Sequence, residues 1–396
     1  MNNQKKSVLI LIPSMANVGG TERMVHSLSK LLEDSKTQIF LASFDAPGTD
    51  FHFESHLTIH TLGPIPRLPL FLRGFAYALA SWRLRQLKSR LNVDITISNL
   101  WGADLINILS GCSDRKISLC HINVVGNPTN RLMIWLLPFV AAIYRRFDHV
   151  VAVSETLSKE LGELYSLNAD KTTFIHNFVS MPHAVSRWSN DFVHRFIWCG
   201  RFSQEKNVDG LLHVWSRFAS TNNRVQLILL GDGPQRSQLQ ALAIELGLKT
   251  TFNLEDLTAS LVFAGKVPDP ASYMLGARAL LLSSYAEGLP MVVLEALSLG
   301  LPVLATDCLA GGVRTALQGS GTCNPSRVNV EFTTAGALLP IPISSNEITL
   351  STWTNCLETV CQNDESWAEW SNGAVLRASM FSSDKARQKW SQLICF

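Results

Sequence analysis

Residues 279–296, ALLLSSYAEGLPMVVLEA, pass from a strand pattern through a polar turn into a helix pattern. The apolar run 279–283 is typical of a buried parallel strand. Pro290 suits the first turn of a helix, because it lacks the N–H that such a position leaves unpaired. A helix start presents its unpaired N–H groups to phosphate or sugar oxygens. Here those groups would belong to Gly288, Leu289, Met291 and Val292.

Two glutamates frame this helix start. Glu287 lies in the turn before the helix, and Glu295 lies within about two turns of its beginning. Helical side chains lean toward the N-terminus of their helix. Both carboxylates can therefore face one cleft. The spacing alone is common, but the frame of strand, Gly-x-Pro turn and helix makes this pair a candidate site.

Strand and helix patterns alternate along the rest of the chain, and they restart after a polar stretch at 180–190. At 396 residues the chain is long enough for two domains. Apolar strands separated by helices favour parallel sheets covered on both faces. We therefore expect an α/β fold with two doubly wound, Rossmann-like domains facing across a cleft. The predicted strands lie at 8–12, 38–42, 94–98, 117–120, 150–153, 173–176, 196–199, 226–230, 261–264, 279–283 and 302–306.

Composition excludes several classes of protein. With 46% apolar and 17% charged residues, the chain is not disordered. A net charge of +2 argues against a polycation that binds nucleic acid. No C-x-x-C pair occurs among the eight cysteines, so we expect reduced thiols in a cytoplasmic protein. The apolar runs are too short to span a bilayer, and no secretory leader is recognised.

Two segments, 66–92 and 131–146, combine basic residues with large apolar ones and contain no acidic residue. This combination is typical of a surface that lies on anionic lipid. A buried helix with arginines at its ends gives the same pattern, and RNA binding is a third use of it. We predict membrane contact through this pair of segments and no nucleic-acid partner.

Two further turns follow predicted strands in the second half. Arg201 and Lys206 lie in the loop after the strand at 196–199, together with Gly200. A forked guanidinium and a compact ammonium are a usual pair for holding a diphosphate. Gly231 opens the turn Gly-Asp-Gly-Pro after the next strand, where glycine allows a ligand to approach the backbone.

These motifs together resemble the family four glycosyltransferases, which are retaining enzymes of the GT-B fold. The resemblance extends over most of the chain. It rests on Gly19-Gly20-Thr21-Glu22, Val153-Ser154, His176-Asn177, Gly200-Arg201 with Lys206, Gly231-Asp232-Gly233-Pro234 and Glu287 through Glu295-Ala296. It implies transfer of a sugar from a nucleotide donor to a hydroxyl group, with retained anomeric configuration.

The resemblance also implies roles for individual residues. Arg201 and Lys206 would hold the donor diphosphate, Glu287 would bind sugar hydroxyls and Glu295 the ribose diol. His121 matches a histidine that faces the transferred sugar, and Gly19 and Gly20 match the loop at the acceptor and diphosphate. We take Glu287, His121, Arg201 and Lys206 as the catalytic candidates. No D-x-D motif occurs, so we expect neither a metal ion nor another cofactor.

The expected domains are residues 1–185 for the acceptor, 186–366 for the nucleotide sugar and a helical segment, 367–396, that packs back on the first domain. The expected donor is a UDP- or GDP-sugar carrying a hexose or an N-acetylhexosamine. The expected acceptor is a lipid-linked glycan or polysaccharide, met at the inner face of the cytoplasmic membrane during O-antigen, capsule or exopolysaccharide assembly. A nucleotide-sugar 2-epimerase and an inactive scaffold remain alternatives; an NAD-dependent dehydrogenase is disfavoured because the first turn lacks G-x-G-x-x-G.

Overall fold

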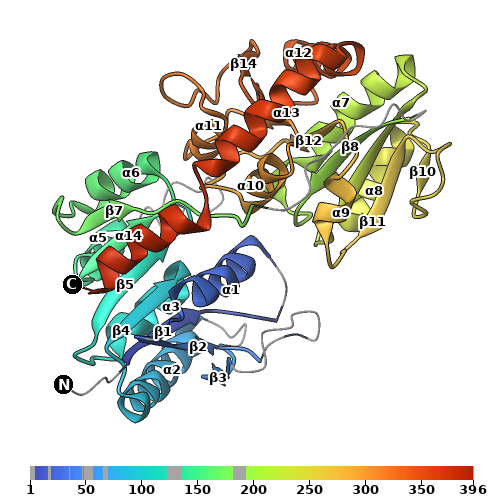
Figure 1. Ribbon diagram of the computed structural model, residues 1–396. Coiled ribbons are helices and arrows are strands. Elements are labelled where there is room, and N and C mark those ends of the chain that lie inside the picture. The colour runs from blue at the N-terminus through green and yellow to red at the C-terminus, as the bar shows by residue number, and fades with distance from the viewer. Residues whose placement is uncertain are drawn as a thin grey trace. The chain divides into compact units, whose positions relative to one another are not determined.

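The computed structural model describes residues 5–16, 19–34, 36–46, 48, 57–65, 70–122, 136–181 and 193–395. Its contacts divide the chain into two compact units. Unit 1 is Met1–Asn177 with Ser383–Phe396, and unit 2 is Phe178–Ser382. Figure 1 shows that each unit is a sheet with helices on both faces. Both units are therefore α/β and Rossmann-like, as the sequence predicted.

Unit 1 is built on a parallel sheet of order β3-β2-β1-β4-β5-β6-β7. Its strands are β1 (Lys6–Ile12), β2 (Thr37–Ser43), β3 (Ile59–Thr61), β4 (Ile95–Asn99), β5 (Arg115–Cys120), β6 (His149–Ala152) and β7 (Thr172–Phe174). Its helices are α1 (Gly20–Leu32), α2 (Leu70–Leu91), α3 (Leu100–Leu109), α5 (Leu137–Tyr144), α6 (Glu155–Tyr165) and α14 (Ser383–Cys395).

The strand order decides which face of this sheet each helix covers. The chain moves one way from β1 to β2, and the other way from β3 through β4, β5, β6 and β7. Right-handed crossovers then place α1 on one face and α2, α3, α5 and α6 on the other. The five apolar side chains that form one stripe of α1 are all buried, which confirms the helix pattern: Met24, Val25, Leu28, Leu31 and Leu32.

Unit 2 is built on a sheet of order β10-β11-β9-β8-β12-β13-β15-β14, in which only β14 and β15 pair antiparallel. The strands are β8 (His194–Cys199), β9 (Val225–Leu230), β10 (Thr250–Thr251), β11 (Leu261–Gly265), β12 (Ala279–Leu282), β13 (Val303–Thr306), β14 (Glu331–Thr333) and β15 (Gly336–Leu339). The helices are η1 (Gln204–Lys206), α7 (Val208–Thr221), α8 (Arg236–Glu245), α9 (Pro270–Met274), α10 (Met291–Ser298), α11 (Gly312–Leu317), α12 (Glu347–Gln362) and α13 (Asp364–Ser379).

The division between the units differs from the predicted boundaries at 185 and 366. The backbone N–H of Val179 donates to the carbonyl of Phe381, and Val179 pairs with Ser382 in an isolated β-bridge. The two segments at which the chain changes unit therefore lie side by side, and both belong to unit 2. The predicted helical segment 367–396 is two helices. α13 packs on α10 and α12 within unit 2, and only α14 returns to unit 1, where it packs on α1.

Specific contacts hold α14 in unit 1. The Lys6 ammonium donates to the carbonyl of Ile394 (2.8 Å), and the Arg115 guanidinium donates to that of Leu393 (2.7 Å). Arg387 donates to the carbonyl of Leu31 at the end of α1, and the Trp390 side chain is fully buried. The helix is therefore part of the core of unit 1.

Two expectations about the whole chain can be compared with the structure. No disulfide joins any of the eight cysteines, all of which lie in described residues. Across the described residues, no helix is long and apolar enough to cross a membrane.

Candidate active site

Three loops meet at the carboxyl edge of the unit 2 sheet, because β8, β12 and β13 are neighbours there. The backbone N–H of Tyr285 donates to the carbonyl of Glu205 (2.9 Å), and the Ser283 hydroxyl donates to that of Lys206 (2.9 Å). The Thr306 hydroxyl donates to the carbonyl of Ser284 (2.6 Å). The loops after these three strands therefore support one another.

Lys206 and Glu287, which the sequence predicted for one site, form an ion pair there. The distance from Lys206 Nζ to Glu287 Oε1 is 2.6 Å, and the Ser284 hydroxyl donates to the same oxygen at 2.7 Å. The Glu287 side chain is 9% exposed and that of Lys206 24%. Among the described residues, no hydrogen bond reaches Glu287 Oε2. This oxygen can therefore accept from a ligand hydroxyl.

The charge of Glu287 controls the pKa of Lys206. Burial lowers the pKa of this ammonium, but the adjacent carboxylate and its hydrogen bond raise the pKa by more than burial lowers it. The net shift of the Lys206 pKa is therefore upward. Lys206 therefore stays protonated at neutral pH. An ammonium has three donors, so Lys206 can hold Glu287 and still donate to a ligand anion.

Asn207 fixes the position of Lys206. It adopts the left-handed conformation (φ 49°) between η1 and α7, and it is buried. Its side-chain amide donates to the carbonyls of Ser283 (3.2 Å) and Pro342 (3.0 Å). Asparagine tolerates this backbone conformation better than most residues. The local sequence Lys206-Asn207 thus ends the short helix and ties it to the loop after β12.

The start of α10 is arranged slightly differently from the prediction. Pro290 is not in the first turn but at the N-cap, with extended backbone (φ −69°, ψ 127°), and its carbonyl accepts from Val293 and Leu294. Within the described part of the chain, the backbone N–H groups of Gly288, Met291 and Val292 have no acceptor. The helix start therefore offers donors, as expected. Leu289 is buried beside it.

Glycine is required where these loops approach one another. A Cβ on Gly231, which has φ +155°, would overlap the carbonyl oxygen of Gly200. A Cβ on Gly312 would overlap the carbonyl oxygen of Gly288 in the same way. The turns after β8 and β9, and those after β12 and β13, thus pack backbone against backbone.

Arg201 and Glu295 belong to the same loop and helix as Lys206 and the start of α10, respectively. The Arg201 side chain is exposed in the loop after β8, and no hydrogen bond or ion pair of its guanidinium occurs with the described residues. Glu295 is half-buried in the second turn of α10. The loop after β8 therefore carries two cations, one paired with Glu287 and one extending into solvent.

The other predicted residues lie in unit 1. His121 follows β5, and its Nε2 lies 3.0 Å from the Oδ1 of Asn99 at the end of β4. Burial lowers the pKa of His121 to about 4, so its imidazole is neutral at pH 7. Gly19 is the N-cap of α1 and Gly20 its first residue, both exposed. The predicted site residues are therefore divided between the two units.

A second charged cluster lies behind the loop after β13. The Arg314 guanidinium donates to both carboxylate oxygens of Asp307 (3.0 and 2.6 Å) and to Glu331 (2.9 Å). Arg327 donates to the same two acids. The sequence patterns indicated neither this network nor the roles of Ser284 and Asn207. Ser284 could have been found as a hydroxyl next to the predicted Glu287 turn, whereas the network joins residues up to 24 positions apart.

Two protein-family models match the chain. The model described as Glycosyltransferase Family 4 matches residues 18–181, and the one described as Glycosyl transferases group 1 matches residues 193–334. Together they span more than half of the chain. None of the curated proteins matches its sequence significantly.

Solved structures similar to this chain include three glycosyltransferase-fold proteins. They are the lipopolysaccharide outer core galactosyltransferase WaaB (19% identity, TM-score 0.68, covering 98% of this chain and 99% of that one), Anabaena Alr3699/HepE in complex with UDP-glucose (20%, 0.75, 98% and 99%) and sucrose-phosphate synthase from Thermosynechococcus elongatus (16%, 0.75, 98% and 98%). At these identities the likeness establishes the fold, which is GT-B. The two family matches and the site at the carboxyl edge of unit 2 agree with it: the chain belongs to the GT4-type glycosyltransferases.

Proposed function

We propose that this glycosyltransferase is a retaining, metal-independent enzyme. It transfers a hexose or N-acetylhexosamine from a UDP- or GDP-sugar to a lipid-linked or polysaccharide acceptor during cell-surface glycan assembly. The observation that carries this proposal is the Lys206–Glu287 pair beside the start of α10, with Glu287 Oε2 left to accept a hydrogen bond. A cation, a carboxylate and a helix start together match the groups of a nucleotide sugar.

The donor would occupy the carboxyl edge of the unit 2 sheet. Arg201 and Lys206 would hold the diphosphate, and the N–H groups at the start of α10 would add donors to its oxygens. Glu287 would accept from a sugar hydroxyl and Glu295 from the ribose diol. The similarity to HepE, whose solved complexes contain UDP and UDP-glucose, supports a nucleotide-sugar donor.

The chemistry follows from where charge develops. Cleavage of the bond between sugar and diphosphate builds negative charge on the leaving group, and fixed cations near it stabilise the transition state. Lys206 supplies such a charge because Glu287 keeps it protonated. Cationic side chains of the protein would thereby neutralise the diphosphate charge that a bound metal ion neutralises in metal-dependent enzymes. For retention we propose attack from the face of the leaving group, with the departing phosphate taking the proton of the acceptor hydroxyl.

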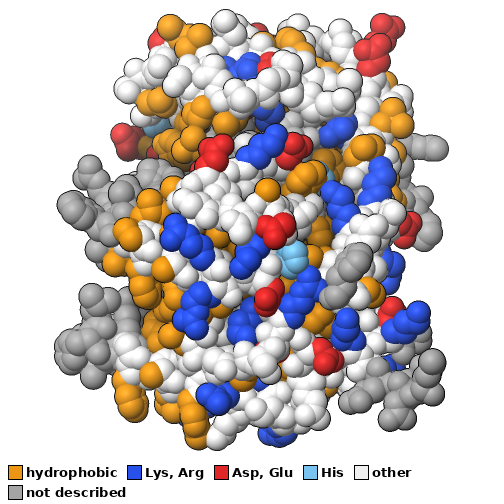
Figure 2. All heavy atoms as spheres, turned by 90° about the vertical axis from the view of Figure 1, so that its left-hand side faces the viewer, with side chains coloured by type: hydrophobic (Ala, Val, Ile, Leu, Met, Phe, Trp, Pro, Cys, Tyr) orange, Lys and Arg blue, Asp and Glu red, His pale blue; other side chains and the backbone are white. Residues whose placement is uncertain are grey.

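The acceptor side of the proposal rests on unit 1. The described parts of segments 66–92 and 131–146 expose Phe75, Trp82, Leu136 and Phe139; residues 66–69 and 131–135 lie outside the described ones. Figure 2 shows hydrophobic side chains reaching the surface next to Lys and Arg on the face that it presents. These features, with the similarity to a lipopolysaccharide galactosyltransferase, support an enzyme at the inner face of the cytoplasmic membrane.

The donor can be tested by the thermal stability of the full chain with UDP- and GDP-sugars, followed by transfer to a synthetic lipid-diphosphate sugar. The anomeric proton of the product, measured by NMR, reports the configuration of the new linkage. We expect retention, and an inverted linkage would overturn the mechanism. Turnover that needs no acceptor would instead indicate an epimerase, and strong inhibition by EDTA would refute metal independence.

The site can be tested with Glu287→Gln and Lys206→Ala. Each should lower turnover at least about a hundredfold if the residues act on developing charge. Glu245→Gln, at the exposed end of α8, is the matched control and should keep normal turnover. Normal rates in the first two variants would remove Glu287 and Lys206 from the site.

A further inference from the structure

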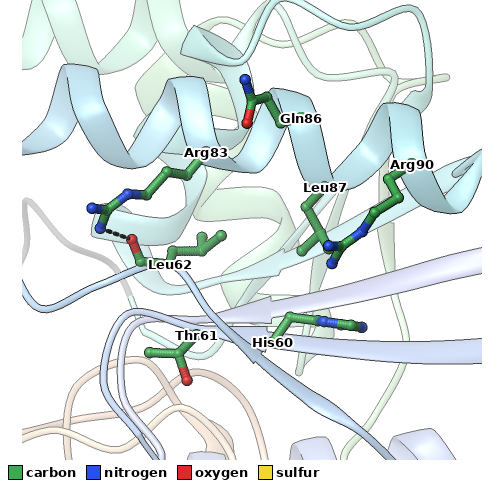
Figure 3. Close-up of a pocket in the computed structure, with 7 residues that line it drawn as sticks. All are labelled: His60, Thr61, Leu62, Arg83, Gln86, Leu87 and Arg90. Carbon is green, nitrogen blue, oxygen red and sulfur yellow. Dashed lines mark hydrogen bonds between the residues drawn. The ribbon is translucent and has the colours of Figure 1, made fainter.

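A groove of about 390 Å³ lies between the edge strand β3 and the helix α2 of unit 1. Figure 3 shows that side chains from the two elements line it. The strand and the residue after it contribute His60, Thr61 and Leu62, and the helix contributes Arg83, Leu87 and Arg90. No residue of this groove is among the candidate site residues of either unit.

The groove is positively charged. Arg83 donates one N–H to the carbonyl of Leu62 (2.7 Å), as the dashed line in Figure 3 shows, and the Arg90 guanidinium extends from α2 toward His60. Neither arginine forms an ion pair with a described residue. No acidic residue occurs between positions 55 and 93 or within β2. Burial and, after it, the charge of Arg90 lower the pKa of His60.

Exposed aromatic side chains lie beside these arginines on the same helix. Phe75 is 73% exposed and Trp82 53%. Phe75 and Trp82 are seven residues apart, and so are Arg83 and Arg90. Residues seven apart lie on one face of a helix, so α2 carries an aromatic stripe next to a guanidinium stripe. Large apolar side chains beside cations are typical of a surface that enters the interface of an anionic bilayer.

We propose that the β3–α2 groove binds the phosphate group of an anionic membrane phospholipid, while Phe75 and Trp82 enter the lipid interface. A guanidinium presents two parallel N–H groups to phosphate oxygens, and that of Arg90 has no hydrogen-bond acceptor among the described residues. The exposed aromatics favour lipid over a soluble phosphate compound, which would leave them in water. The inference rests on the proposed membrane setting of the enzyme but not on its sugar donor.

The test measures co-sedimentation of the full chain with phosphatidylcholine vesicles that contain or lack phosphatidylglycerol. Arg90→Gln should weaken binding to phosphatidylglycerol vesicles about tenfold or more, as expected for loss of a charge-assisted hydrogen bond. Arg85→Gln is the matched control, since it removes the same charge from the same helix. Arg85 does not line the groove but lies near Gly111. Its variant should lose no more than the roughly fivefold effect of one surface cation.

Trp82→Ala should also weaken vesicle binding, and Arg90→Lys should restore part of the loss caused by Arg90→Gln. Equal effects of Arg90→Gln and Arg85→Gln on vesicle binding would overturn the proposal that the groove binds a headgroup. They would indicate a general electrostatic attraction between the basic helix and the anionic vesicle surface. Binding of soluble glycerol phosphate or single-stranded RNA without vesicle binding would overturn the lipid assignment. The midpoint of thermal unfolding without ligand verifies that each variant is folded. Failure of all nucleotide sugars to stabilise the parent chain would count against the proposed donor and would leave this test intact.

Discussion

The Lys206–Glu287 pair should contribute a measurable coupling to the stability of the protein. The two charges lie 2.6 Å apart in a partly buried setting, with Ser284 as the other group bound to the carboxylate. Removing one partner of a buried pair costs about 3–5 kcal/mol, because the other charge stays buried. Since the Lys206 side chain is 24% exposed, we expect Lys206→Met to cost about 3 kcal/mol, near the lower end of that range.

The double variant should lose less unfolding free energy than the two single variants lose when their losses are added. In Lys206→Met with Glu287→Gln, no unpaired charge remains, so the cycle should give a coupling of about 2 kcal/mol. The assay is urea unfolding of the full chain, followed by tryptophan fluorescence, for the parent, both single variants and the double variant. The exposed pair Lys159–Glu155, with side chains 72% and 56% exposed, serves as the control cycle and should show little coupling by comparison, because solvent screens both charges.

The pH dependence gives this prediction a second readout. A carboxylate that has lost its cation partner costs stability only while it is ionised, so the stability lost in Lys206→Met should be smaller in acid than at neutral pH. In the parent the folded pKa of Lys206 is the raised one, so the pair contributes fully below the unfolded value of 10.5 and is lost above it. A coupling below about 0.5 kcal/mol, or a deficit that does not change with pH, would refute this account of the pair.

Three further predictions concern other parts of the chain. Gly231→Ala should destabilise unit 2 by several times the roughly 1 kcal/mol expected for Gly247→Ala, because only the former places a Cβ on a carbonyl oxygen; equal losses in urea unfolding would contradict the close approach. Arg314 holds the pKa of Glu331 at about 2 against the opposing effect of burial, so its stabilisation should be present above pH 4.5 and disappear toward pH 2. Glu331→Gln should make the free energy of unfolding less dependent on pH below pH 4.5. An unchanged dependence would count against this role of Glu331. His121 should titrate near pH 4 by imidazole NMR, so that stability falls as pH drops below about 6.5; a midpoint of 6.5 would show that burial does not control it.

Much of the fold could be predicted because the central strands are continuous apolar runs. All eleven predicted strands occur, within two residues at each end. β3, β10, β14 and β15 were missed. β3, β10 and β14 have only two or three residues and lie toward the margins of the sheets, where a strand needs no long apolar run. The break between α13 and α14 was missed as well, since Phe381 continues the helical pattern but is buried in unit 2.

In the candidate site, too, features set by neighbouring residues could be predicted, whereas contacts between residues far apart in the sequence could not. Glu287 and Lys206 could be placed together because each follows a strand, and neighbouring parallel strands end at one edge. Their direct ion pair could not be predicted, since it depends on Asn207 turning the backbone and on contacts across 81 positions of sequence. Pro290 lies one position earlier than expected because its extended backbone belongs to the turn, and the helix begins after it.

The return of α14 to unit 1 has a consequence for synthesis on the ribosome. Unit 1 consists of two segments that are separated in the sequence by the whole of unit 2, and Trp390 of the second segment is part of its interior. While unit 2 is being translated, the first 177 residues have no α14 to pack on α1. A nascent chain must leave the surface that receives α14 uncovered until this helix emerges, and a chain shortened before Ser383 would never cover it. Shortening the protein from its carboxyl end should thus damage its amino-terminal half first.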